Sequence, residues 1–294
     1  MAREIVNGIG IEYEVHGPDS GHPVILTPGG RFSMEAIGVR EFAHALAGLG
    51  LKAILWDRPN CGKSDLSLDG PSESEMQAVH LTGLLRKLGT GPAAIIGGSG
   101  GSRVSMLAAA RDPEMCSHLG LWWISGDPIG LMQLGGYYCG EAAGLASMGG
   151  MEAVLKATSW ADNLANNPSS KDKLLAMRPD DFIAVMQKWC AAYVPSPVSP
   201  VPGMGLGDFA RLTMPTLVLR SCSSDLSHTR ATSEWVARLI PHCRFIDPPW
   251  PKDEWNHRAG AQAAGTGQGL FNSWPMLAPQ IADLVKLPQP SYAG

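Results

Sequence analysis

Short apolar runs alternate with amphipathic stretches along the first part of the chain. The apolar runs have the length of buried strands and span residues 23–27, 51–56, 93–96 and 119–124. The stretches between them carry apolar residues at helical spacing and span residues 41–48, 73–88 and 103–110. An alternating segment, residues 3–16, is broken by Asn7-Gly8 and predicts two more strands joined by a tight turn. Strands that alternate with helices predict a mostly parallel, twisted sheet flanked by helices on both faces.

The alternation of predicted strands and helices stops at residue 128 and resumes near residue 210. Residues 128–209 contain helix-like stretches, no clear buried strand, and a proline-rich connector at residues 195–202. Strands are predicted again at residues 216–219 and 244–246, with helices at 234–240 and 277–287. The pattern therefore predicts one α/β core, residues 1–127 and 210–294, interrupted by a helical insert, residues 128–209.

Composition and charge narrow the class of protein. Of 294 residues, 45% are hydrophobic and only 17% are charged, which excludes a highly charged disordered chain. The net charge of −4 provides no basic field for a nucleic acid. No apolar run reaches the roughly 18 residues of a membrane span, and the N-terminus lacks the apolar stretch of a signal peptide. We expect a cytoplasmic protein that binds a small-molecule substrate and does not bind a membrane. Assembly into a homodimer is an open alternative.

The six cysteines do not indicate a metal or redox site. No two of them lie close enough to form a Cys-x-x-Cys pair. Scattered cysteines in a chain of this size are typical of buried small hydrophobic residues in a reducing compartment. We expect no metal and no cofactor.

The strongest chemical signal is Gly97-Gly98-Ser99-Gly100-Gly101, which lies between a predicted strand and a predicted helix. That context is typical of a nucleophile elbow, where a strained turn exposes a serine hydroxyl at a helix N-terminus. The glycine spacing does not fit a dinucleotide-binding turn, because the position that needs the last glycine is Arg103. Gly62-Lys63-Ser64 is not a phosphate loop either, because its first glycine would be Asp57.

A serine nucleophile needs a base and an orienting acid. Asp225 follows the strand at 216–219, and His257 follows the strand at 244–246, so both are expected at the sheet edge that carries Ser99. His228 and His242 are alternatives for the base, although His228 is expected at the rim because it follows Asp225 so closely. Asp127 is the alternative for the acid.

The oxyanion and substrate contacts are predicted from the neighbouring loops. The amides of Gly100 and of Gly30, with Arg31 as second choice for the latter, are candidate oxyanion donors. Arg31, Tyr137, Trp160 and Trp189 are candidate substrate-binding residues, although most bulky residues of the insert are expected to pack in its own core. Arg31, Arg58 and Arg103 lie near the predicted pocket edge, where one of them would hold a carboxylate.

Together these residues resemble the α/β-hydrolase superfamily, in its serine hydrolase branch with a helical cap. The resemblance covers nearly the whole chain and includes the loop from Asp57 to Ser64, which is similar to the family's Asp-x-Pro/Arg-Gly-x-Gly-x-Ser loop. It implies an α/β-hydrolase fold, a cap at 128–209, and a Ser99–His257–Asp225 triad. Two departures are Pro28-Gly29 in place of the usual His-Gly, and the sequence Trp255-Asn256-His257-Arg258 around the histidine.

Serine rather than aspartate at the elbow argues against dehalogenase or epoxide hydrolase chemistry. We therefore expect a metal-free, carboxylesterase-like serine hydrolase that cleaves a small, mostly apolar ester or lactone through an acyl-enzyme. One alternative is a C–C bond hydrolase of meta-cleavage-type diketone products. Another is a non-hydrolytic user of the fold, namely a lyase, a cofactor-free oxygenase or a receptor.

Overall fold

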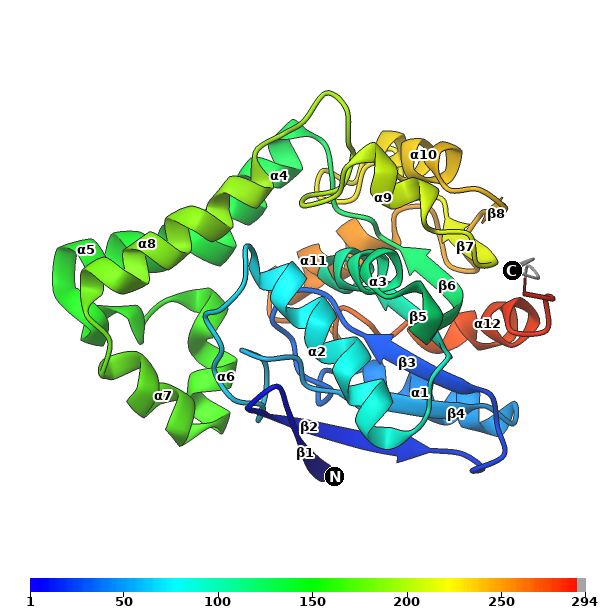
Figure 1. Cartoon of the computed structure of the whole chain (residues 1–294). Helices are drawn as coiled ribbons and strands as arrows, with labels where there is room; N and C mark the ends of the chain where they lie inside the picture. Colours follow the sequence, from blue (N-terminus) through cyan, green and yellow to red (C-terminus); the bar gives the residue numbers. More distant parts are fainter. Residues whose placement is uncertain (290–294) are drawn as a thin grey trace.

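Eight strands form one twisted sheet in the computed structural model, which describes residues 1–289 (Figure 1). The strands are β1 (Ala2–Val6), β2 (Ile9–His16), β3 (Pro23–Thr27), β4 (Lys52–Trp56), β5 (Ala93–Gly98), β6 (Cys116–Trp122), β7 (Thr216–Leu219) and β8 (Cys243–Ile246). Their order is β1-β2-β4-β3-β5-β6-β7-β8. The N-terminal hairpin pairs antiparallel, and every neighbouring pair from β4 to β8 is parallel. The predicted sheet is therefore confirmed.

The side chains of the central strands alternate between two cores. Ile25, Ile54 and Ile95 pack with α2 (Glu73–Leu88), α3 (Gly100–Arg111) and α10 (Arg230–Leu239) on one face. Their neighbours along the strands, such as Leu26 and Leu55, pack with α1 (Val39–Gly48) and α12 (Ala278–Leu284) on the other. Each such side chain contributes roughly 1.5–3 kcal/mol by leaving water, so both faces must be covered.

The insert connects β6 to β7 and lies beside the sheet as a separate helical layer (Figure 1). Its elements are α4 (Pro128–Gly135), a π-helical turn η2 (Gly136–Gly140), α5 (Glu141–Val154), η3 (Thr158–Trp160), α6 (Ala161–Asn166), α7 (Pro168–Leu175), α8 (Pro179–Cys190), η4 (Ala191–Tyr193) and α9 (Leu206–Ala210). Trp160, Phe182 and Trp189 belong to a third core, which the insert shares with Leu66 and Met76. The last residues of the predicted α/β core, 290–294, lie outside the described residues.

Polar contacts hold the insert against the loop that follows β4. Asn163 Nδ2 donates to the carbonyl oxygens of Gly62 and Ser64, each at 3.0 Å. Lys173 Nζ donates to the carbonyl oxygen of Leu66 at 2.9 Å. These side chains satisfy main-chain carbonyls that the insert would otherwise bury without partners.

One helix departs from the sequence prediction. The segment after β8, where the sequence predicted no helix before residue 277, contains α11 (Glu254–Ala263). Because this segment is helical, only the side chains on one side of α11 can face the sheet edge that carries Ser99. All six cysteines are free, and Cys61, Cys116 and Cys139 are buried. Across residues 1–289, no helix combines the length and apolar character needed to cross a bilayer.

Candidate active site

Ser99 occupies a strained turn between β5 and α3. Its φ of 56° and ψ of −126° lie in a region that L-residues rarely adopt. The turn is tight, since a Cβ atom on Gly101 would collide with the Thr27 carbonyl oxygen, and one on Gly29 would lie 2.6 Å from Ser99 Cβ. Ser99 is only 7% exposed. The glycines of the predicted elbow are therefore required by close backbone approach.

His228, not His257, meets the Ser99 hydroxyl. The Ser99 Oγ lies 2.8 Å from His228 Nε2, and His228 Nδ1 lies 3.0 Å from Asp225 Oδ2. Because a carboxylate only accepts hydrogen bonds, Nδ1 carries the proton, and Nε2 accepts from the Ser99 hydroxyl. Asp225 and His228 are almost fully buried. A hydroxyl, an imidazole and a carboxylate thus form one continuous hydrogen-bonded chain, which is the arrangement that activates a serine.

Both oxygens of Asp225 bind the same short segment. Oδ2 accepts from the His228 ring, whereas Oδ1 accepts from the backbone N–H groups of Ser227 and His228, each at 2.9 Å. This Asx-type turn follows β7 directly and leads into α10, whose N-cap is Thr229. One carboxylate therefore fixes the position of the histidine backbone and the orientation of its ring.

Two tryptophans cover the remaining faces of the His228 ring. Trp123 stacks on it at a centroid distance of 6.2 Å with an interplanar angle of 25°. Trp255 packs edge-on at 4.5 Å and 88°. Trp255 comes from α11, so the segment that follows β8 does reach the site, but it contributes an indole.

The expectation that His257 contacts Ser99 is wrong, and the helix period explains why. His257 lies two residues beyond Trp255 on α11, and residues two apart on a helix point to nearly opposite sides. Because Trp255 packs on His228, His257 faces away, and it is exposed. Its amide donates to the Asp253 carbonyl at 2.9 Å, as in any helix. The other candidates also lie elsewhere, since His242 and Asp127 are exposed.

The candidate oxyanion donors lie side by side. A Cβ atom built on Gly100 would be 3.3 Å from the Gly30 amide nitrogen and 3.1 Å from the Tyr138 hydroxyl. Arg58 braces the Gly30 turn, because its Nη2 donates to the carbonyl oxygen of Gly30 at 2.8 Å. The Gly30 amide nitrogen thus lies close to Gly100, the residue that follows Ser99.

The buried carboxylate of Asp57 binds the backbone of the loops that follow β3 and β4. Asp57 accepts hydrogen bonds from the amides of Met34 at 2.8 Å and Lys63 at 2.9 Å. Burial raises the pKa of Asp57 to about 6, although these two hydrogen bonds oppose the shift. Asp57 and Arg58 therefore serve the local structure of the loops and are not free to bind a substrate.

The predicted substrate-binding residues have different surroundings from those expected. Arg31 forms a buried ion pair in which Nε and Nη2 donate to Glu73 at 2.9 and 3.1 Å. Burial would lower the pKa of Arg31, but the Glu73 carboxylate raises it above its ordinary value. Trp160 and Trp189 are buried in the core of the insert, and Tyr137 is partly exposed beside Tyr138. Among residues 1–289, none of these four side chains forms a hydrogen bond or a ring contact with Ser99 or His228.

Glu73→Gln tests the structural role of the Arg31 pair. The substitution leaves the Arg31 guanidinium buried without its anion, so we expect the free energy of unfolding to fall by about 3–5 kcal/mol. Urea denaturation followed by circular dichroism measures this loss. Glu75→Gln on the same helix is the control, because Glu75 pairs with the partly exposed Arg111 and should lose at most about 1 kcal/mol. Equal losses in the two variants would contradict the assignment.

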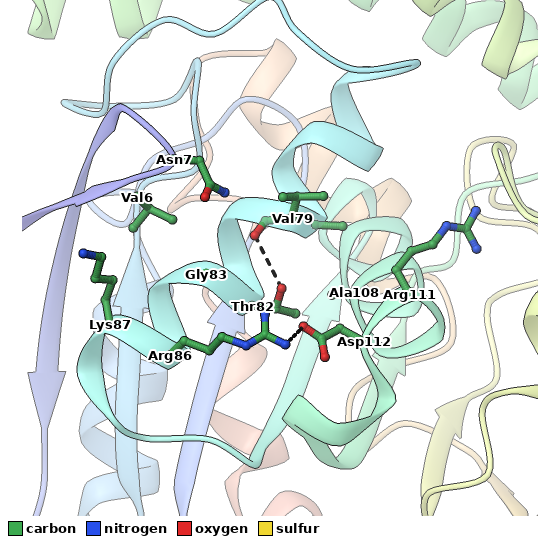
Figure 2. Close-up of a pocket in the computed structure, with 11 residues that line it drawn as sticks. Val6, Asn7, Val79, Thr82, Gly83, Arg86, Lys87, Ala108, Arg111 and Asp112 are labelled. Carbon is green, nitrogen blue, oxygen red and sulfur yellow. Dashed lines mark hydrogen bonds and ion pairs between the residues drawn. The ribbon is translucent and has the colours of Figure 1, made fainter.

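A large pocket on the molecule is separate from this site. It has a volume of about 490 Å³ and lies between the end of β1, α2 and α3 (Figure 2). Its lining includes Thr82, Lys87 and an ion pair between Arg86 and Asp112, with 2.5 Å between Nη2 and Oδ2. It contains no nucleophile beside a base, so we do not assign the chemistry to it.

Sequence reasoning named His228 only as an alternative base, and it missed Trp123, Trp255 and Tyr138 as residues of the site. A usable signal for His228 was present, since Asp225-Leu226-Ser227-His228 follows a buried strand and places an acid and an imidazole within one turn. The indoles gave no such signal, because their role depends on α11 and on the positive φ of 47° at Trp123.

Comparison with solved structures shows the same architecture at low sequence identity. The enol-lactonase from Burkholderia xenovorans LB400 is 17% identical, with a TM-score of 0.62, over 97% of this chain and all of that chain. A variant of a meta-cleavage product hydrolase, CumD, is 18% identical with a TM-score of 0.60 over 97% of both chains. MGS-M2, an α/β hydrolase from a Medee basin deep-sea metagenome library, is 14% identical with a TM-score of 0.62 over both full lengths. No protein-family model and no curated protein sequence matches the chain.

Proposed function

We propose that this chain, which has the α/β-hydrolase fold, is a serine hydrolase that uses Ser99 as nucleophile, His228 as base and Asp225 as orienting acid. The observation that carries the proposal is the continuous hydrogen-bonded chain from Ser99 Oγ through the His228 ring to Asp225. It is supported by the strained turn at Ser99 and by the two backbone amides beside it.

The proposed reaction forms and then hydrolyses an acyl-enzyme. Ser99 Oγ attacks the acyl carbonyl while its proton passes to His228 Nε2, and the amides of Gly30 and Gly100 stabilise the oxyanion. Collapse of this intermediate expels the alcohol, which takes the proton from His228. Water then attacks the acyl group, His228 receives a proton from it, and breakdown of the second intermediate restores Ser99 and releases the acid.

The substrate class that we propose is a small carboxylic ester or lactone. Ser99 is only 7% exposed, which favours small molecules over polymers. A C–C bond hydrolase is the second candidate, because one solved structure of the same fold is a meta-cleavage product hydrolase. Turnover of p-nitrophenyl esters, compared with turnover of vinylogous 1,5-diketones, separates the two.

A fluorophosphonate tests whether Ser99 is activated. We expect intact-mass analysis to show a single adduct on the wild-type protein, since the reagent requires a nucleophilic hydroxyl beside a base. The Ser99→Ala variant should show none. A folded wild-type protein that acquires no adduct, or an adduct that persists in Ser99→Ala, would count against the serine hydrolase and favour a lyase, an oxygenase or a receptor.

A further inference from the structure

Three arginines are buried near Ser99, and their hydrogen bonds differ. Arg31 is neutralised by Glu73 and also donates to Ser159 Oγ at 2.7 Å. Arg58 leaves its Nε without a partner, but its Nη2 is shared among the main-chain carbonyls of the turn that it braces. Arg103 donates from Nη2 to the Tyr193 hydroxyl at 3.0 Å, and its guanidinium also interacts with the Tyr138 hydroxyl. Its Nε and Nη1 are buried and have no partner among residues 1–289.

Arg103 lies where a substrate would meet the catalytic serine. It is on α3, one helical turn after Ser99, and only 2% exposed. Its Nη2 would be 3.7 Å from a Cβ atom built on Gly100, which is the point that also faces the Gly30 amide and the Tyr138 hydroxyl. The unsatisfied guanidinium is therefore adjacent to the two candidate oxyanion donors.

Two tyrosines from the insert hold the guanidinium in place. Its Cζ lies 5.6 Å from the ring centroid of Tyr138 and 5.1 Å from that of Tyr193, and the two rings stack at 5.6 Å with an interplanar angle of 13°. Aromatic rings attract a cation but do not neutralise it. Burial raises the pKa of Tyr193 well above its ordinary value, so its hydroxyl remains neutral.

A buried cation without an adjacent anion is costly, and the Glu73 carboxylate, which helps to raise the pKa of Arg103, pairs with Arg31 instead. The Arg103 guanidinium forms no ion pair among residues 1–289, whereas Arg31 beside it does. A guanidinium offers two edges that match a carboxylate, Nε with Nη2 and Nη1 with Nη2. Each edge of Arg103 contains one nitrogen without a partner, and Nη2 has a second N–H besides the one it donates to Tyr193. Ligand binding would supply both the missing charge and the missing acceptors.

We propose that Arg103 binds a carboxylate of the substrate, so that the substrate is an ester or lactone carrying an anionic group near its reacting carbonyl. This inference rests on the proposed function and names its substrate class. Because Arg103 Nη2 lies close to the space between Gly30 and Gly100, the linker between carbonyl and carboxylate must be short, as in a half-ester of succinate or glutarate.

Binding is tested first, without turnover, in the Ser99→Ala protein. We expect glutarate to raise the midpoint of thermal unfolding by about 3 °C or more at saturating concentration, whereas glutaramide or sodium chloride of equal ionic strength does not. Ser99→Ala/Arg103→Met should lose this shift. Ser99→Ala/Arg178→Met is the matched control and should keep it, because Arg178 is exposed and pairs with Asp181 on the surface of the insert.

Selectivity is tested next with two matched esters. We expect the wild-type kcat/KM for p-nitrophenyl hemiglutarate to exceed that for methyl p-nitrophenyl glutarate by about tenfold to 100-fold, the range that a charged hydrogen bond provides. In Arg103→Met this ratio should fall to about 1, and Arg103→Lys should recover part of it because the charge remains. A merely structural role would change stability or both rates together and leave the ratio unchanged.

The outcomes separate this inference from the proposed function. A fluorophosphonate adduct at Ser99, combined with equal rates for the two esters and no shift with glutarate, would overturn the carboxylate site and leave the hydrolase standing. A glutarate shift that depends on Arg103, without any adduct on the wild-type protein, would support the carboxylate site and overturn the hydrolase. A wild-type preference for the neutral ester would overturn the inference even if every Arg103 variant failed to fold.

Discussion

Replacing His228 by alanine is expected to lower kcat/KM toward acyl substrates by about 10⁶-fold, the loss seen when a serine triad is deprived of its base. The reason is geometric, because Nε2 is the acceptor placed 2.8 Å from the Ser99 hydroxyl. Without it, the hydroxyl proton has no base in the described site, and the leaving alcohol has no acid. The rate of fluorophosphonate labelling should fall together with turnover.

His257→Ala is the control for this experiment. His257 is exposed on α11, so its loss should leave kcat/KM within about twofold of the wild type. The folded state of both variants is checked by near-ultraviolet circular dichroism, since the His228 ring packs between Trp123 and Trp255. If His257→Ala were inactive and His228→Ala active, the insert and α11 would have to rearrange in solution, and the proposed base would be wrong.

Replacing Asp225 by asparagine is expected to lower kcat by about 10⁴-fold, as in other triads. Asp225 Oδ2 accepts from His228 Nδ1 and thereby leaves Nε2 free to accept the serine proton. An amide NH₂ at that position would donate to Nδ1, which would move the imidazole proton to Nε2 and disable the base. The change in kcat is measured with a p-nitrophenyl ester at saturating concentration.

Asp127→Asn is the comparison for Asp225→Asn, because Asp127 was the other candidate for the acid. It is exposed at the start of α4, and the hydrogen bonds of the His228 ring go to Asp225 and Ser99 instead, so kcat should stay within about twofold of the wild type. Asp225→Asn could lose activity because the turn from Asp225 to His228 becomes disordered or because the imidazole takes the wrong tautomer. Urea denaturation distinguishes the two causes, since only disorder of the turn lowers the free energy of unfolding markedly. A loss of less than tenfold in kcat would exclude Asp225 as the orienting acid.

Much of the fold could be predicted because the sheet is buried on both faces. Central strands such as residues 93–98 must be apolar at every position, and the covering helices must be apolar at helical spacing, so both leave a clear pattern. Helix α2 shows the same clarity, since Ser72 caps its first turn and Gly89 ends it in the left-handed conformation. The α/β-hydrolase fold expected from these features is confirmed.

The site could be predicted only where local backbone chemistry fixes it. Ser99 and the glycines around it could be predicted from the sequence because a strained turn tolerates few other residues. Asp225 was found from its place after β7, but its partner was sought after β8, where ligand-binding residues of such sheets also gather. Sequence alone did not reveal that α11 begins at Glu254, and this helix turns His257 outward and Trp255 inward.

The insert shows a different limit. Its aromatic residues were expected in part to line the pocket, but an apolar side chain carries the same signal in a core as in a binding site. Trp160 and Trp189 pack inside the insert, whereas Tyr138 and Tyr193 reach over to Arg103. Which of them turn toward Ser99 depends on how the insert docks on the loops after β4 and β5, and no local pattern encodes that docking.

The short turn that joins Asp225 to His228 makes the acid and the base one local module. Their mutual geometry is set by hydrogen bonds within four consecutive residues, and it does not depend on how the segment after β8 folds. The segment after β8 therefore does not need to provide the base. It is free to change in sequence and length, and through Trp255 it can reshape the approach to the imidazole while the proton relay stays intact.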